Sequence, residues 1–136
     1  MYVVRRFPAT WPRWLLGILF IAHGLNGFVN YMPQAATPIP ERALAFVAAL
    51  TIAGYVFPLV NAIEIAAGVL LLANRFVPLA LVALAPIVVN IVAFYVVLGG
   101  LAPAGTLLAV LVLGLEGYLV WTHREVFRPM LTSFDT

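Results

Sequence analysis

The sequence predicts an all-α integral membrane protein, organised as a single domain over residues 1–136. We expect a four-helix bundle with a short extra helix at about residues 40–53. Composition is the first reason, because 65% of the 136 residues are hydrophobic, only 9% are charged, and the mean hydropathy is +1.11. Soluble domains carry about 25% charged residues. The second reason is that four apolar runs are long enough to cross a bilayer as helices and lack the alternation of barrel strands.

The four predicted spans cover residues 14–31, 57–73, 76–98 and 104–122. Each contains about 17–23 residues, which at roughly 1.5 Å per residue matches a hydrocarbon core of about 30 Å. The first run differs from a signal peptide, because no small-residue cleavage site follows a short apolar region and Asn26 and Asn30 interrupt it. We therefore treat it as a mature helix.

A proline-rich segment separates the first two spans. Its prolines predict an extended loop over residues 32–39. Pro40 suits a first helical position, and Glu41 then lies near the positive end of the helix dipole. These features predict a short helix from Pro40 to Ala53, lying on or dipping into the outer face of the membrane.

The short helix is expected to end before the second span begins. Gly54 suits a C-terminal stop, and Pro58 suits the first turn of the following helix. The alternative is one helix over residues 40–73 with a kink at Pro58. That helix would measure about 50 Å, which is more than a bilayer needs. We therefore favour two helices with a turn at residues 54–55.

The arginines are unevenly divided between the two ends of the predicted spans. With both termini on one side, six of the seven basic residues share that side: Arg5, Arg6, Arg13, Arg75, Arg124 and Arg128. Only Arg42 lies on the other side. The positive-inside rule then places both termini in the cytoplasm, with Trp11, Trp14 and Trp121 near the inner interface.

A few polar side chains interrupt the spans at similar depths. Along ideal helices, His23 and Glu64 each lie about 14 Å from the cytoplasmic ends of their spans, and Asn26 and Asn61 lie about 18 Å from them. A charged group facing lipid costs about 2.5–3.5 kcal/mol, so such side chains should face the bundle interior. We therefore expect a polar intramembrane pocket formed by His23, Asn26, Asn61, Glu64, Asn90 and Glu116.

Two interpretations of this pocket remain open. In one, its members are structural and hydrogen-bond across helices. In the other, it is a site in which Glu64 and His23 share a proton and serve a quinone headgroup, a proton path or a small polar solute. Glu116 also has a simpler interpretation as the ion-pair partner of Arg124 or Arg128.

Several classes of chemistry have no support in the sequence. The absence of cysteine excludes disulfides, thiolate nucleophiles and cysteine metal sites. His23 and His123 lie at different depths and cannot ligate one haem. No phosphate loop, nucleotide fingerprint or nucleic-acid surface is evident. We therefore predict no catalytic residue, no metal site and no cofactor held covalently or by a motif. Quinone or lipid is the candidate ligand.

Three segments together resemble the DoxX family of small bacterial four-helix membrane proteins, over roughly residues 14–129. They read LLGILFIAHGLNGFVNYMP, TIAGYVFPLVNAIEIAAGVLLLANRFVPLALVALAPIVVNI and LEGYLVWTHREVFRP, and ANRFVPLALVALAPIVVN is the most specific part. Asn26, Glu64, Asn90 and Glu116 fall at the polar intramembrane positions of that family. Tyr95 is a departure, because relatives carry a histidine there.

The resemblance implies a multi-pass protein of the bacterial inner membrane that does not act as an enzyme by itself. The family is named for a small subunit of an archaeal thiosulfate:quinone oxidoreductase, and other members are linked to membrane redox or oxidative-stress complexes. It thus implies an accessory subunit of a quinone-linked or electron-transfer complex, in contact with lipid and with other subunits or copies of itself. The alternative is a stand-alone quinone-binding, small-molecule-binding or carrier protein that uses the polar pocket.

Overall fold

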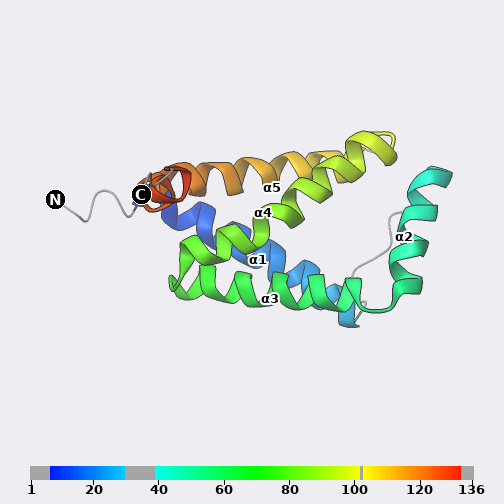
Figure 1. The fold of residues 1–136 in the computed structure, drawn as a ribbon, viewed down its shortest axis with the longest axis horizontal. Helices are drawn as coiled ribbons and strands as arrows, with labels where there is room; N and C mark the ends of the chain where they lie inside the picture. Colours follow the sequence, from blue (N-terminus) through cyan, green and yellow to red (C-terminus); the bar gives the residue numbers. More distant parts are fainter. Residues whose placement is uncertain (1–6, 30–38, 102, 133–136) are drawn as a thin grey trace.

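The computed structural model describes residues 7–29, 39–101 and 103–132, and helices make up most of them. Four long helices lie alongside one another, and a shorter one, α2, lies across one end of the bundle (Figure 1). This confirms the predicted four-helix bundle with a short extra helix. The elements are α1 (Phe7–Val29), α2 (Glu41–Ala53), α3 (Val56–Ala73), α4 (Val77–Ala93), η1 (Phe94–Leu98), α5 (Pro103–Thr122), α6 (Arg124–Phe127) and η2 (Arg128–Leu131).

Three of the described helical segments are long and apolar enough to cross a membrane. They are Val56–Ala73, Val77–Leu98 and Pro103–Thr122, and the bounds of each agree with a predicted span to within one residue. Helix α1 falls outside this group, because Arg13, His23 and Asn26 lower its hydropathy. A membrane crossing by α1 therefore stays a prediction.

Helix α1 begins at Phe7, seven residues before the predicted start of the first span. The apolar run marks only the part suited to lipid, whereas the helical backbone continues beyond it. Pro12 lies inside the helix, close to its N-terminus, and removes one backbone hydrogen-bond donor there. The predicted loop at residues 32–38 lies outside the described residues, as do Asn30, Tyr31, Arg5 and Arg6.

Helix α2 ends at Ala53 and α3 begins at Val56, so the helical path is interrupted at Gly54, where a stop was predicted. Gly54 has a left-handed backbone with φ of 84°, and its N–H donates to the carbonyl of Thr51 at 3.1 Å. Glycine adopts this conformation without the steric cost that a Cβ would add. The prediction of two helices is confirmed, and the single kinked helix over residues 40–73 is excluded. Helix α2 begins at Glu41, one residue later than predicted, so Pro40 is its N-cap and not its first helical residue.

Glycines bring α1 and α3 into close contact. A Cβ on Gly24 would lie 2.7 Å from the backbone oxygen of Asn61, and one on Gly68 would lie 2.8 Å from the backbone oxygen of Gly17. Small residues at helix interfaces allow backbones to approach closely in membrane proteins. The α1–α3 pair is accordingly the most extensive helix contact in the described structure.

Fully buried leucines from all four long helices belong to the core of the bundle, and α4 contributes two of them, Leu81 and Leu84. Leu16, Leu71, Leu84 and Leu119, from α1, α3, α4 and α5, each have 0% exposure. All four belong to one hydrophobic cluster. We call these four residues the leucine layer.

The side chain of Arg13 joins α1 to the end of α3. Its Nη1 donates to the carbonyl of Leu71 at 3.1 Å, close to where α3 ends at a left-handed Asn74 with φ of 55°. The last carbonyls of a helix lack partners within the helix and carry partial negative charge. The carbonyl of Leu71 also accepts from the N–H of Asn74 at 3.3 Å, so the guanidinium adds a second donor to it and joins α1 to α3.

We predict that Arg13→Ala lowers the free energy of unfolding by about 1.5 kcal/mol, since a hydrogen bond from a charged donor is lost. Denaturant unfolding in detergent micelles, followed by tryptophan fluorescence, measures the change. Arg75→Ala is the matched control, because Arg75 is an exposed arginine just beyond the same helix end. Equal effects of the two substitutions would show that the Arg13 bond contributes nothing.

Candidate functional site

The imidazole of His23 and the carboxyl group of Glu64 form a close pair between α1 and α3. Nδ1 of His23 lies 3.0 Å from Oε2 of Glu64. The contact follows from the local sequence, because Gly24 lets the two helices approach at this level, and its missing Cβ would lie 3.3 Å from Cβ of Glu64. The two residues were placed at equal depth from the sequence, and the packing brings their side chains together.

The two members of the pair have unequal access to their surroundings. The Glu64 side chain is 1% exposed, whereas that of His23 is 55% exposed. Oε1 of Glu64 has no hydrogen-bond partner among the described residues. The carboxyl group is therefore the buried partner that orients the ring, and the ring is the accessible member of the pair.

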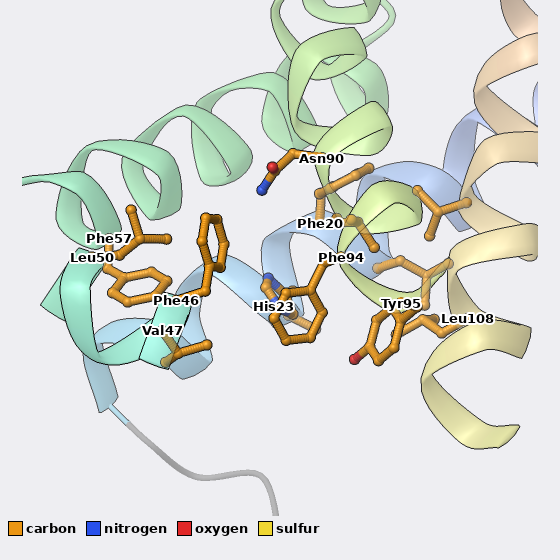
Figure 2. A pocket seen from close by; sticks show the side chains of 14 residues that line it. Phe20, His23, Phe46, Val47, Leu50, Phe57, Asn90, Phe94, Tyr95 and Leu108 are labelled. Carbon is orange, nitrogen blue, oxygen red and sulfur yellow. The ribbon is translucent and has the colours of Figure 1, made fainter. Parts of the chain in front are cut away.

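A cavity of about 470 Å³ lies beside His23, between the bundle and α2. Figure 2 shows that His23, Phe46, Phe94 and Tyr95 surround it, from α1, α2 and η1. The ring centroids of Phe46 and Phe94 are 6.0 Å apart, and those of Phe94 and Tyr95 are 5.2 Å apart. The complete lining is Leu19, Phe20, Ala22, His23, Phe46, Val47, Leu50, Phe57, Asn90, Ile91, Phe94, Tyr95, Leu108 and Val112.

The wall at Phe94 and Tyr95 is a π-helical turn that ends α4. The N–H of Gly99 donates to the carbonyl of Phe94 at 2.7 Å, which is the five-residue spacing of this wider turn. A Cβ on Gly105 would overlap the Tyr95 ring, so the glycine makes room for that ring beside α5. Single π-helical turns occur frequently at functional sites.

Only two of the six residues predicted to form one pocket line this cavity. His23 and Asn90 line the cavity, and Glu64 lies behind His23. Asn61 is buried at 6% exposure, with its side chain in the space that a Cβ on Gly27 would need. Asn26 and Glu116 are outside the cavity lining.

Glu116 does not form the ion pair considered from the sequence. It is 5% exposed, and neither carboxyl oxygen has a hydrogen-bond partner among the described residues. Arg124 lies over the ring of Trp121 instead, 4.7 Å from its centroid, and Arg128 donates to Glu125 at 3.5 Å. The ion-pair interpretation is wrong because α5 turns Glu116 into the bundle, whereas both arginines follow the helix end and are exposed.

The contribution of α2 to the cavity was missed at the level of sequence. Phe46, Val47 and Leu50 lie at positions i, i+1 and i+4, which share one face of a helix, and all three line the cavity. That spacing was a usable signal. Polar residues were the guide to the expected pocket, whereas most of the wall is apolar.

These features define a class: a small α-helical membrane protein in which a histidine–glutamate pair borders an internal aromatic cavity. The DoxX family model matches residues 10–99, about two thirds of the chain. The chain belongs to the DoxX family. The match includes His23, Glu64 and Asn90, whereas Glu116 and the segment LEGYLVWTHREVFRP lie beyond it. No curated protein and no solved structure matches the chain.

Proposed function

We propose that this protein binds a lipophilic quinone within the membrane and acts as an accessory subunit of an electron-transfer complex. The observation that carries the proposal is the aromatic cavity of about 470 Å³ with the His23–Glu64 pair in its wall. Ligand sites of this size are generally apolar, with a few polar groups that orient the ligand. The cavity has the same combination.

The lining favours a flat and uncharged ligand. Aromatic side chains from four elements face the cavity: Phe20, Phe46, Phe57, Phe94 and Tyr95. Such rings stack on a planar headgroup at centroid separations of about 4.5–7 Å. None of the described lining residues is an arginine or lysine, and the nearby Glu64 disfavours an anion. An anion such as thiosulfate therefore suits this cavity less well than a neutral quinone.

The pair provides a hydrogen-bonding group that changes with its proton content. With Glu64 as a carboxylic acid, its O–H donates to Nδ1, and Nε2–H of His23 then donates to a quinone carbonyl. When the proton on Nε2 is lost, the carboxyl proton moves to Nδ1. The carboxylate then accepts a hydrogen bond from Nδ1–H, and Nε2 accepts one from a quinol hydroxyl. Asn90 offers a second donor and acceptor in the same wall. Residues of this chain thereby hold and move a proton, while we assign electron transfer to a redox subunit in the same complex.

We further propose four membrane passes in a bacterial inner membrane, with both termini in the cytoplasm. The start of α1, the α3–α4 turn and the end of α5 lie at one end of the bundle (Figure 1). That end carries Arg13, Arg75, Arg124 and Arg128, whereas Arg42 begins α2 at the other. Trp11, Trp14 and Trp121 are exposed on the helices at the arginine-rich end, as expected for an interfacial belt.

A stand-alone carrier is the second candidate, and one observation favours it. Residues from α1, α2, α3, α4, η1 and α5 of this chain surround a cavity of about 470 Å³, so this chain offers a ligand site of its own. Purification in mild detergent separates the two possibilities. Redox subunits that co-purify support the accessory role, whereas a pure oligomer with bound quinone supports the carrier.

The purified protein should bind a short-chain benzoquinone, and Phe94→Ala should weaken that binding about tenfold, since an aromatic contact contributes about 0.5–1.5 kcal/mol and 1.4 kcal/mol corresponds to tenfold. Equilibrium dialysis measures the dissociation constant, and solvent extraction identifies any bound native quinone. Phe76→Ala is the control, because Phe76 is 70% exposed and outside the lining. Absence of binding, or equal losses in both variants, would contradict the proposed site.

A further inference from the structure

The four residues of the leucine layer lie at a constant sequence distance from residues near the His23–Glu64 pair. On each long helix, a leucine of the layer lies seven residues from a side chain at the level of the cavity. The four pairs are His23 with Leu16, Glu64 with Leu71, Ile91 with Leu84, and Val112 with Leu119. Seven residues are two helical turns, or about 10 Å, along the same side of a helix. The leucine layer therefore lies about two turns from the His23–Glu64 pair, on the side away from α2, and the cavity wall at Leu19 and Phe20 comes within about one turn of it.

This layer separates the titratable groups of the site from the arginine-rich end. Its four leucines are fully buried and belong to one cluster with Phe20, Leu81 and Val88, whose exposures are 0–2%. A buried water needs about two to four polar partners, and an apolar region of this kind stays dry. Among the described residues, the four leucine side chains offer a proton no hydrogen-bonding group at this level.

The charged and titratable side chains on the elements around the pair are few. Glu116 lies three residues before Leu119 on α5, so it is on the same side of the layer as His23 and Glu64. Tyr95 is on η1, and Glu41 and Arg42 begin α2. Arg13, three residues before Leu16 on α1, lies on the far side.

We propose that the His23–Glu64 pair exchanges its proton with one face of the membrane only, the face on which α2 lies. The exposed ring of His23 borders the cavity at the α2 end, and the buried carboxyl group returns or takes a proton through Nδ1. A proton on Nε2 leaves to water at that face, and the Glu64 carboxyl proton moves to Nδ1. Re-protonation follows the reverse path.

This inference rests on the proposed function. If a quinone binds in the cavity, one-sided access determines on which side of the membrane its protons are released. When a bound quinol is oxidised by the redox centre of a partner subunit, its two electrons pass to that centre. Its two protons leave one after the other through Nε2 to the α2 face. With the predicted orientation, that face is the outer one, so quinol oxidation here releases protons outside the cell.

The chain contains no cysteine, so a single introduced thiol reports its own access to water. We would introduce His23→Cys and treat right-side-out and inverted membrane vesicles with a charged, membrane-impermeant methanethiosulfonate. Thr51→Cys on α2 and Glu125→Cys on α6 mark the two faces, since both residues are exposed. We expect His23→Cys to react at least about tenfold faster from the face that labels Thr51→Cys.

Three further outcomes keep this test decisive. Asn90→Cys, also in the cavity lining, should show the same sidedness and replaces His23→Cys if that variant does not insert. Glu116→Cys should react from neither face, because that position is 5% exposed. Labelling of the cavity thiol from the Glu125 face, from both faces equally, or from neither would overturn the proposal. One-sided labelling without any quinone binding would refute the proposed ligand and leave the access intact.

Discussion

Glu64→Ala is expected to lower the free energy of unfolding by about 2 kcal/mol, because it removes the hydrogen bond by which a fully buried side chain joins α3 to α1. The carboxyl group is 1% exposed and holds His23 at 3.0 Å across the α1–α3 contact. Its removal also leaves a void in that contact, which adds to the cost. Denaturant titration of the protein in micelles, followed by tryptophan fluorescence, measures the loss.

Two matched variants distinguish the effect of losing the Glu64 hydrogen bond from two other effects. These are the loss of the Glu64 charge and the general effect of removing a carboxylate. Glu64→Gln keeps the side-chain volume and can donate its amide N–H to Nδ1, so it should cost less than about 1 kcal/mol. Glu125→Ala removes an exposed carboxylate whose nearest cation is 3.5 Å away, and surface pairs of this kind contribute about 0–1 kcal/mol. A Glu64→Ala protein as stable as Glu125→Ala would show that the pair does not hold α1 to α3.

Gly24→Ala should destabilise the bundle by about 1–3 kcal/mol, the range typical of overpacked interfaces. The new Cβ would lie 2.7 Å from the backbone oxygen of Asn61 and 2.8 Å from Cγ1 of Ile65. Because one of those neighbours is backbone, α1 must move away from α3, and the distance between His23 and Glu64 must then increase. Thermal unfolding in detergent and quinone binding should both weaken.

The chain contains its own control for this substitution. A Cβ added to Gly114 on α5 would have no heavy atom of a neighbouring residue within 4 Å, so Gly114→Ala meets no obstacle. Alanine is favoured over glycine within a helix by about 1 kcal/mol, so this variant should be as stable as the parent protein or slightly more stable. Equal stability of Gly24→Ala and Gly114→Ala would mean that the close α1–α3 approach is not required.

Much of the fold was predictable because it depends on properties that are local along the chain. The length of an apolar run predicts a helix suited to a bilayer, and α3, α4 with η1, and α5 agree with that prediction. The break at Gly54 was predictable from the backbone freedom of glycine. The start of α1 was not, since a helix can extend beyond the apolar run into a sequence whose hydropathy says little about its backbone.

The site was predictable in part, for a related reason. Counting residues along a helix places His23 and Glu64 at one depth, and the structure has them in contact. Glu116 is expected lower along its span but in the same pocket; it is buried, yet it lies outside the cavity lining and its carboxyl oxygens have no partner among the described residues. Depth alone does not say which way a side chain points around the helix axis.

The amino-acid order alone thus determined the membrane class, the lengths and order of the apolar helices, and the heights of the polar groups, because these follow from composition and from the constant rise of a helix. The rotation of each helix and the choice of its neighbours were decided only in the folded bundle. Contacts such as Gly24 against Asn61 set that rotation, and they join residues far apart in the chain. The aromatic cavity, the His23–Glu64 contact and the leucine layer all depend on such contacts.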